Sequence, residues 1–183
     1  MKQLERDIDS ILISASKIQD EIALLAEKIA GDYEGRDLTV IAVLSGSIVF
    51  LADLIRHLPL RLRIKVISAA SYGASTTSSG EVQVLRGLDF DFEGEDVLIV
   101  DDILDTGRTL RRIREEIERG KPSSIRSCVL LDKAARRVVD IQADYVAFEI
   151  PDEFVVGYGL DFNGYYRNLP YIAKLRQEAI VEA

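Results

Sequence analysis

The residues of this sequence with the clearest chemistry lie together at positions 101–109. Asp101, Asp102 and Asp105 follow an apolar segment, Val97–Val100, and precede the segment Thr106–Thr109, which reads TGRT. Carboxylates this close together repel one another, and they cost stability unless a cation or a polyhydroxyl ligand uses them. We therefore predict a ligand site in this stretch.

The Thr106–Thr109 segment has the composition of a phosphate-binding turn. It precedes a predicted helix, Leu110–Arg119, and the start of a helix presents free backbone N–H groups and the positive end of the helix dipole. The hydroxyls of Thr106 and Thr109 add polar contacts, while Gly107 lets the backbone approach a ligand closely. An ordinary helix cap would explain a lone Thr-Gly better, but a cap does not require the three acids. We predict a phosphate site without a Walker lysine.

A scaffold must hold these residues, and the hydrophobic pattern predicts alternating strands and helices. The predicted strands are Ile8–Ile13, Leu38–Leu44, Leu62–Ala69, Glu81–Arg86, Val97–Val100, Ile125–Leu131, Tyr145–Ile150 and Phe154–Tyr158. The predicted helices are one with a capping box at Ser16 and Gln19 that ends at Gly31, then Ile48–Leu58, Leu110–Arg119 and Tyr171–Ile180. This alternation is typical of a mostly parallel α/β sheet, in which ligands gather at the carboxyl ends of the strands.

The composition of the chain excludes several classes of protein. Its 183 residues are 48% hydrophobic and 30% charged, which suits one well-packed core and is too short for two ordinary domains. The formal net charge of −8 argues against a protein that binds the phosphate backbone of nucleic acids. His57 is the single histidine, so any metal must be held by oxygen ligands.

The remaining composition signals concern location and single residues. The longest apolar stretches fall short of the roughly 20 residues that cross a bilayer, and we expect no secretory signal. Cys128 is the single cysteine and cannot form an internal disulfide, so we expect a reducing, cytoplasmic location. Cys128 is expected to pack as a buried small hydrophobe, and His57 to cap a helix at the surface.

Residues 71–80 read SYGASTTSSG and carry too little apolar surface to offset the entropy lost on ordering. We predict a mobile loop there, between two strands.

Three separated segments of the chain resemble the type I phosphoribosyltransferases. Val97–Leu110 (VLIVDDILDTGRTL) resembles the family's signature for 5-phosphoribosyl 1-diphosphate (PRPP). Val43–Leu54 (VLSGSIVFLADL) resembles the pyrophosphate loop and the helix after it, and Phe148–Pro170 resembles the base-binding hood. The resemblance covers about Ile8–Leu169, and an aspartate directly before Thr-Gly, here Asp105, is typical of the hypoxanthine–guanine branch.

The resemblance implies an α/β fold of the type I phosphoribosyltransferases, with a mostly parallel central sheet flanked by helices. Residues 1–183 would form a single domain. Its core would span about residues 32–145, and a small hood would be built from about residues 1–15 and 146–183.

The resemblance also implies roles for the acidic stretch. Asp101 and Asp102 resemble the pair that approaches the ribose hydroxyls, directly or through Mg²⁺. Asp105 resembles the carboxylate beside N7 of the purine, which accepts a proton from the attacking base and is the general acid/base. The segment from Asp105 to Thr109 would hold the 5′-phosphate, with Arg108 contributing mainly backbone.

Further roles fall on residues near the carboxyl end of the chain. Lys133 resembles the lysine that donates to O6 of the purine, although a solvated lysine at a strand end is the plainer interpretation. Phe154 resembles the aromatic that stacks on the purine, and the main chain of Val155 would contact its edge. Asp161 resembles a ligand of the Mg²⁺ that bridges the pyrophosphate, or else a turn residue, and Arg167 the guanidinium that contacts the departing pyrophosphate.

The substrate-binding residues implied in this way are Leu44, Ser45, Gly46, Ser71, Tyr72, Asp101, Asp102, Ile103, Asp105, Thr106, Gly107, Arg108, Thr109, Lys133, Phe154, Val155, Asp161 and Arg167. The implied Mg²⁺ ligands are Asp101, Asp102 and Asp161.

Two positions depart from the family's pattern. Ser45 stands where the family often has lysine, so the loop would bind pyrophosphate through its amides, with a cis peptide at Leu44–Ser45 as one means. Asp101 stands where the family often has glutamate, and its shorter side chain is compatible with contact through water.

The implied activity is purine salvage by Mg²⁺-dependent transfer of the phosphoribosyl group from PRPP to hypoxanthine or guanine, giving IMP or GMP and pyrophosphate. Closure of the 71–80 loop, with Ser71 and Tyr72 at its base, would exclude water as a catalytic lid. A homodimer or homotetramer is expected. A receiver domain is the first rival, but its acidic strand should start the domain; an RNA-binding, non-catalytic relative is the second, and Asp105 and the acidic net charge argue against it.

Overall fold

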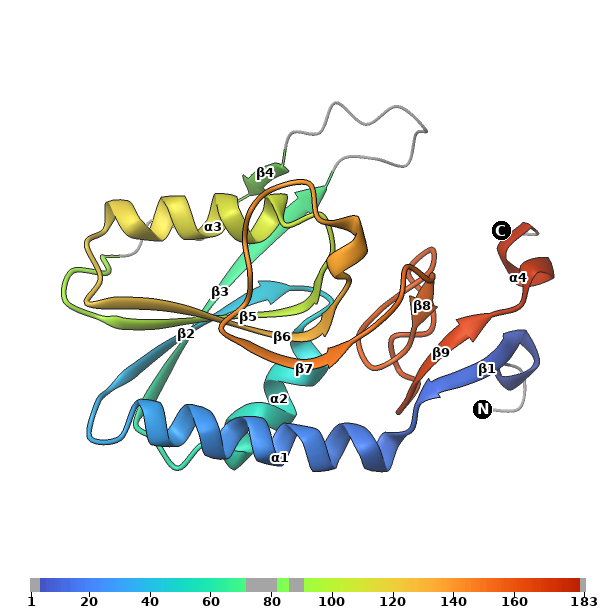
Figure 1. Cartoon of the computed structure of the whole chain (residues 1–183), viewed down its shortest axis with the longest axis horizontal. Coiled ribbons are helices and arrows are strands. Elements are labelled where there is room, and N and C mark those ends of the chain that lie inside the picture. The colour runs from blue at the N-terminus through green and yellow to red at the C-terminus, as the bar shows by residue number, and fades with distance from the viewer. Residues whose placement is uncertain (1–3, 72–81, 86–90, 182–183) are drawn as a thin grey trace.

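The computed structural model describes residues 4–71, 82–85 and 91–181, which form two sheets (Figure 1). The larger sheet has the strand order β4-β3-β2-β5-β6-β7, and the smaller sheet has the order β1-β9-β8. The strands of the larger sheet are β2 (Leu38–Leu44), β3 (Leu62–Ser71), β4 (Val82–Leu85), β5 (Asp96–Leu104), β6 (Ser124–Asp132) and β7 (Tyr145–Glu149). All neighbours in it are parallel except β4, which runs antiparallel to β3. The predicted, mostly parallel α/β sheet is confirmed.

Helices cover both faces of the larger sheet. The helices are α1 (Ala15–Asp32), α2 (Ile48–His57), α3 (Arg108–Arg119) and α4 (Gln177–Val181), with short 3-10 turns at Leu4–Asp7 and Ala134–Arg136. The first two lie against one face and α3 lies against the other (Figure 1). No helix in the described part of the chain is long and apolar enough to cross a membrane.

Alternate residues of the central strands supply the two cores between sheet and helices. Val40 and Leu98 pack in the cluster that contains α1 and α2, whereas Ile41 and Ile99 pack with α3. Successive side chains of a strand point to opposite faces, so both faces of β2 and β5 are buried and the strands read as continuous apolar runs. Cys128 lies in the first cluster and is fully buried, as predicted, while His57 is exposed at the end of α2.

The start of α1 differs from the prediction. Ser14, not Ser16, is the N-cap, and its hydroxyl accepts a hydrogen bond from the backbone N–H of Lys17 at 3.3 Å. Gln19 does not complete a capping box, because its side-chain amide donates to Asp53 on α2 at 2.8 Å. The predicted box at Ser16 and Gln19 was therefore wrong, and a tertiary contact uses the glutamine instead.

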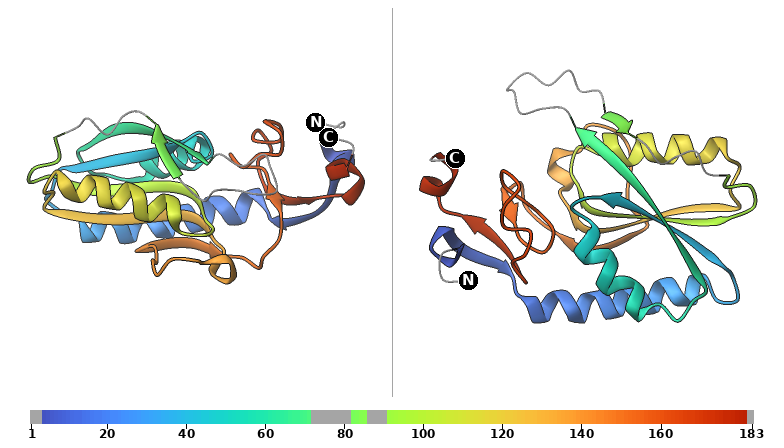
Figure 2. Two further views of the ribbon diagram at one scale, coloured as in Figure 1. Left: turned by 90° about the horizontal axis from the view of Figure 1, so that it is seen from above. Right: turned by 180° about the vertical axis from the view of Figure 1, so that it is seen from behind.

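The smaller sheet joins the two ends of the chain into the hood, and in the other views it again lies at one end of the molecule (Figure 2). Its strands are β1 (Ile8–Ile13), β8 (Val155–Val156) and β9 (Ile172–Leu175), and β9 pairs antiparallel with both of the others. The predicted helix Tyr171–Ile180 was wrong over its first half. The hydrophobic pattern of the four residues of β9 is too short to distinguish a strand from one turn of a helix.

Two other predictions concern the segments around β3 and β8. The predicted strand Phe154–Tyr158 contains only the two residues of β8, because tight turns follow it. The predicted mobile loop and lid fall on residues 71–80, of which 72–80 lie outside the described residues. The lid therefore stays a prediction.

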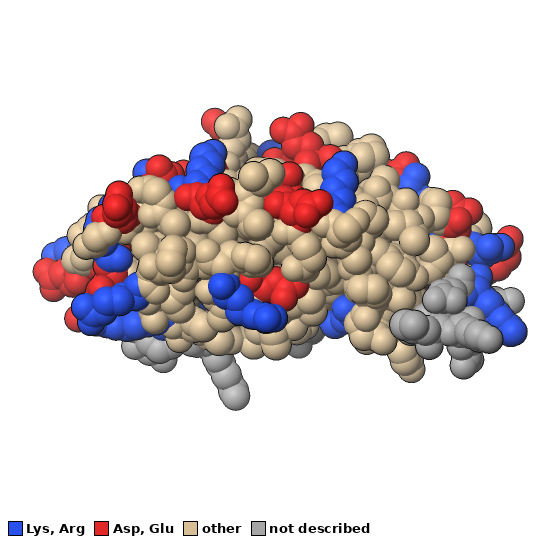
Figure 3. Space-filling model, turned by 90° about the horizontal axis from the view of Figure 1, so that it is seen from below, with Lys and Arg blue, Asp and Glu red and all other residues tan. Residues whose placement is uncertain are grey.

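The face over which α1 runs carries acidic and basic side chains intermingled (Figure 3). A surface that binds a phosphate backbone presents one sign of charge instead.

Candidate active site

Parallel strands place four chain segments at one edge of the larger sheet. Leu44 ends β2, Leu104 ends β5, Asp132 ends β6 and Glu149 ends β7. Leu104 is in register with Asp132, and Asp132 with Glu149, so these carboxyl ends are level with one another. This is the edge at which open α/β sheets bind ligands.

The acidic pair lies inside β5 and not in the loop after it. Asp101 is buried, with 8% of its surface exposed, and Asp102 is partly exposed. Burial raises the pKa of Asp101 well above its usual range, and the neighbouring carboxylate of Asp102 raises it further. Burial also raises the pKa of Asp102, and the positive charge of Arg167 opposes that shift. A bound cation would relieve both carboxylates.

The loop between β2 and α2 lies directly over Asp102. The Leu44–Ser45 peptide is cis, as expected. A Cβ atom built on Gly46 would lie 1.6 Å from Asp102 Oδ2, so only glycine fits there. The buried hydroxyl of Ser47 donates to the carbonyl of Val43 at 2.5 Å and closes the turn. The backbone of Gly46 therefore lies directly against the carboxylate of Asp102.

The turn between β5 and α3 places the Thr-Gly-Arg-Thr segment at a helix start. Gly107 is the N-cap of α3 in the left-handed region, with φ of 84°, and α3 begins at Arg108 rather than at Leu110. A Cβ at Gly107 would lie 2.6 Å from Ile141 Cγ2 and 2.8 Å from Val139 Cγ2. The carbonyl of Thr106 accepts from Val138 N–H at 3.1 Å, so residues 138–141 support the turn from behind.

Arg137 holds the end of β5 and was not predicted as a site residue. Its guanidinium donates to the carbonyl of Leu104 at 3.0 Å and to the carbonyl of Asp105, and it pairs with the carboxylate of Asp132. The side chains of Arg137 and Asp132 are 15% and 14% exposed. The sequence around Arg137 does not indicate these contacts, because Leu104 and Asp132 lie on different strands that come together only in the folded sheet.

The carboxylate of Asp105 faces Arg136, which also contacts Asp152 of the hood. Arg136 Nε lies 3.0 Å from Asp105 Oδ1, and Arg136 Nη1 lies 3.5 Å from Asp152 Oδ1. Asp105 Oδ1 is buried and lacks a partner with hydrogen-bond geometry. An oxygen of this kind has acceptor capacity left for a donor on a ligand.

Lys133 follows β6 and is buried, with 7% of its surface exposed. Its backbone N–H donates to the carbonyl of Leu104 at 3.0 Å, which fixes it beside the end of β5. A buried lysine at the ligand edge does not fit the plainer interpretation of a solvated strand end.

The hood brings an aromatic ring and an ion pair to the same edge. Phe154 is 51% exposed, and the Phe162 ring meets it edge-on with centroids 5.5 Å apart. Val155 is buried on β8 and paired with β9. Asp161 accepts from Gly164 N–H at 2.8 Å, as a turn residue does, and also pairs with Arg167 Nη2 at 2.7 Å.

The hood touches the loop of β2 through glycine. A Cβ on Gly159 would lie 2.0 Å from the carbonyl oxygen of Gly46, and Arg167 Nη1 donates to the carbonyl of Gly159 at 2.6 Å. Together with the charge of Arg167 acting on Asp102, this contact joins residues 44–46, the acidic pair and Arg167 into one region. Ser71 ends β3, and Tyr72 lies outside the described residues.

Comparisons with known proteins agree with this geometry. The model of the phosphoribosyl transferase domain family matches residues 11–163. The chain is 43% identical over 175 residues to the hypoxanthine-guanine phosphoribosyltransferase of Streptococcus thermophilus, covering 96% of this chain and 97% of that enzyme.

Solved structures give the same picture. The hypoxanthine phosphoribosyltransferase of Staphylococcus aureus superposes with a TM-score of 0.90 at 43% identity, covering 96% of each chain. The hypoxanthine-guanine phosphoribosyltransferase of Bacillus anthracis superposes with a TM-score of 0.85 at 45% identity, covering 92% of this chain and 98% of the other.

The chain belongs to the phosphoribosyl transferase family and has the type I fold of that family, with five parallel strands in the central sheet and a small antiparallel sheet as the hood. Within the family, the relatives just described are enzymes named for hypoxanthine, and two of them are named for guanine as well.

Proposed function

We propose that this chain transfers the 5-phosphoribosyl group from PRPP to hypoxanthine or guanine, giving IMP or GMP and pyrophosphate, in purine salvage. One observation carries the proposal above the others. The buried oxygen of Asp105, the start of α3 and the buried Lys133 lie together at one edge of the sheet, and Arg136 links Asp105 to Asp152, two residues before the exposed Phe154. This set suits a purine that is attached to a ribose 5-phosphate.

The reaction replaces one bond at C1′ of the ribose. N9 of the purine forms a bond to C1′ while the bond from C1′ to the pyrophosphate oxygen breaks, and the proton of the attacking base goes to Asp105 from N7. Arg137 keeps the backbone of Asp105 in place for this transfer, since it binds the carbonyls of Leu104 and Asp105. In the reverse direction Asp105 returns the proton.

The phosphates are bound by backbone and by cations of the chain. The free N–H groups at the start of α3 hold the 5′-phosphate, with the hydroxyls of Thr106 and Thr109. Amides of residues 44–46 and the guanidinium of Arg167 bind the pyrophosphate. Ile103, the residue of β5 that follows Asp102, lies beside the bound substrate. Arg108 contributes its backbone.

The purine is selected by its edge. Lys133 donates to O6 of an oxopurine, Phe154 stacks on the ring and the main chain of Val155 binds the edge beside it. An RNA-binding relative without catalysis would have no use for the Asp105 carboxylate.

Asp101 and Asp102 offer the carboxylate ligands with which proteins commonly hold a substrate-bound Mg²⁺. Mg²⁺ in phosphate sites is held by one or two carboxylates, with substrate oxygens and waters filling the other positions. Asp101 and Asp102 provide the carboxylates on one side and Asp161 on the pyrophosphate side, and no cluster of three or more metal-binding side chains occurs among the described residues. When bound, the ion neutralises charge on the departing pyrophosphate. We keep the predictions of a homodimer or homotetramer and of a cytoplasmic location, the latter resting on the single cysteine.

A spectrophotometric assay tests the proposal. Hypoxanthine, guanine, xanthine and adenine are each supplied with PRPP and Mg²⁺, and formation of the nucleotide is followed with and without EDTA. We expect turnover of hypoxanthine or guanine that EDTA abolishes. Turnover of adenine alone, or of no base, would refute the assignment.

A further inference from the structure

Three consecutive residues of the hood occupy the left-handed region of the backbone. Gly157, Tyr158 and Gly159 have φ values of 98°, 50° and 102°. Glycine adopts such angles readily, whereas a residue with a side chain rarely does. Something must therefore hold Tyr158 in this conformation.

The side chain of Tyr158 leaves the hood and enters the main core. The residue is 4% exposed and belongs to the cluster that contains α1 and α2, while its neighbours Val156 and Leu169 belong to the separate cluster of the hood. Its hydroxyl donates to Asp53 Oδ2 on α2 at 2.5 Å, and the same oxygen accepts from Gln19 on α1 at 2.8 Å. Burial and the Asp53 carboxylate both raise the pKa of Tyr158, so the hydroxyl keeps its proton.

The backbone beside Tyr158 supports the pyrophosphate side of the site. Tyr158 N–H donates to the carbonyl of Leu169 at 2.8 Å, and Gly159 N–H donates to the carbonyl of Arg167 at 2.9 Å. Arg167 in turn binds the carbonyl of Gly159, and Gly159 rests against the carbonyl of Gly46. A shift of Tyr158 would move Gly159 and Arg167 relative to the 44–46 loop.

We infer that Tyr158 is a positioning residue for PRPP binding: its hydrogen bond to Asp53 fixes Arg167 and Gly159 of the hood against the 44–46 loop. Gln19 completes the contact by holding the same carboxylate from α1. The inference rests on the proposed function for its kinetic consequence, whereas the structural contact itself can be tested without turnover. Tyr158 does not touch the reacting atoms, so its effect should fall on PRPP affinity.

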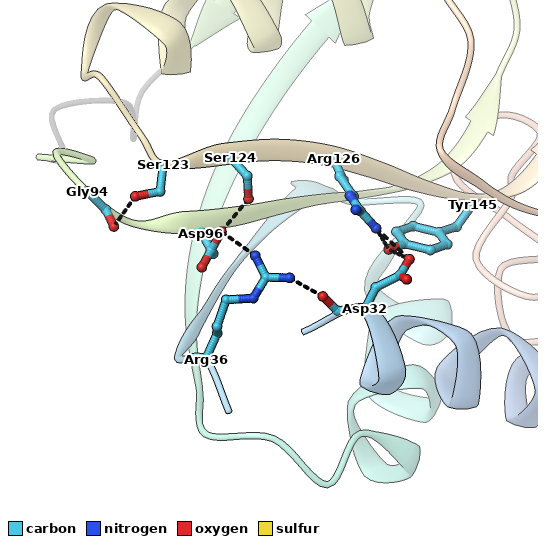
Figure 4. A network of polar contacts seen from close by, with 8 residues as sticks. All are labelled: Asp32, Arg36, Gly94, Asp96, Ser123, Ser124, Arg126 and Tyr145. Atoms are coloured by element: carbon cyan, nitrogen blue, oxygen red, sulfur yellow. Dashed lines mark hydrogen bonds and ion pairs between the residues drawn. The ribbon is translucent and has the colours of Figure 1, made fainter. Parts of the chain in front are cut away.

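The chain offers a matched control in Tyr145, at the amino end of β7 (Figure 4). Tyr145 is 2% exposed, and its hydroxyl donates to Asp32 Oδ2 at 2.7 Å, beside Arg126. This bond also joins a buried tyrosine to a carboxylate on a helix, but at the end of the sheet away from the ligand edge. Tyr145→Phe and Tyr158→Phe therefore remove the same chemical group from two places.

The experiment measures steady-state kinetics for PRPP and for hypoxanthine in both variants and in the parent. Tyr158→Phe should raise the KM for PRPP about tenfold, with kcat and the KM for hypoxanthine within about twofold, because a displaced Arg167 weakens one subsite. Tyr145→Phe should change none of these values. Equal effects of the two substitutions on PRPP, or an unchanged KM in Tyr158→Phe, would overturn the inference.

Amide hydrogen exchange gives a second measurement that needs no activity. Tyr158→Phe and Asp53→Asn should both speed exchange in residues 157–169, the double variant should add little to either, and Tyr145→Phe should leave this segment unchanged. A parent protein without PRPP activity would contradict the proposed function, whereas unchanged exchange in Tyr158→Phe would contradict the positioning role.

Discussion

Replacing Gly46 by alanine tests whether the loop over the acidic pair must lie where the structure places it. The new Cβ would lie 1.6 Å from Asp102 Oδ2 and 2.5 Å from its Cγ, and an ordinary contact begins at 3.4 Å. The two groups must therefore separate by about 2 Å. The carboxylate cannot turn away freely, because Ile103 N–H donates to its other oxygen at 2.9 Å.

The size of the effect follows from this displacement. A misplacement of about 1 Å in a positioned group can cost about 10²-fold in rate, which is about 2.7 kcal/mol of transition-state stabilisation. We expect Gly46→Ala to lower kcat/KM for PRPP by about 10²-fold or more. The free energy of unfolding should fall by about 1–3 kcal/mol, as in other overpacked sites.

The control is Gly31→Ala in the last turn of α1, where an added Cβ meets nothing within 4 Å. That change should stabilise the protein by about 0.5–1 kcal/mol, because alanine is the better helix former, and leave the kinetics unchanged. Steady-state kinetics measures kcat/KM for PRPP, and urea unfolding measures the free energy of unfolding. In an Asp102→Ala background, Gly46→Ala should cost much less stability, since the space is vacated. A Gly46→Ala enzyme within twofold of the parent would refute the reasoning.

Four further predictions concern single side chains. Asp105→Asn should keep the fold and the PRPP affinity, measured by calorimetry, and should lower kcat, measured by steady-state kinetics, by about 10²–10⁴; an unchanged kcat would show that Asp105 is not the acid/base. Lys133→Ala should lower kcat/KM for hypoxanthine and guanine relative to adenine, and an equal loss of kcat/KM for all three bases would show that Lys133 does not bind O6 of the purine. Asp161→Ala should raise the Mg²⁺ and PRPP concentrations needed for half-maximal rate, and superimposable saturation curves would disprove this role. Burial raises the pKa of the Cys128 thiol, so Cys128 should resist alkylation at pH 8 until the protein unfolds, and rapid labelling of the folded protein, read by mass spectrometry, would contradict the structure.

Local sequence signals predicted the elements whose stability depends on their own composition. Leu38–Leu44 forms a strand at the predicted bounds, because a continuous β-branched apolar run suits a position buried on both faces. The acidic strand and the Thr-Gly turn were found for a similar reason: neighbouring residues carry that pattern within one short segment. The family resemblance extended these local matches to the hood.

Elements that depend on a distant partner were not readable in the same way. Ile172–Leu175 forms a strand only because β1 lies beside it, and the two segments are at opposite ends of the chain. Gln19 has the spacing of a capping residue, yet Asp53 on α2 takes its amide. In each case the local preference is small, and a tertiary contact outweighs it.

The sequence by itself therefore determined the α/β class and the acidic and phosphate-binding segments, since each depends on residues within a few positions, whereas the close contact of Gly107 with Val139 and Ile141 came only from the fold. Only the tertiary structure decided which groups support them. The guanidinium of Arg137 reaches the carbonyls of Leu104 and Asp105, at the end of β5, from the segment after β6. Tyr158 crosses from the hood to Asp53, 105 positions away. These contacts depend on the packing of whole elements, because a side chain finds a partner only after the sheet and helices have fixed the distance between them.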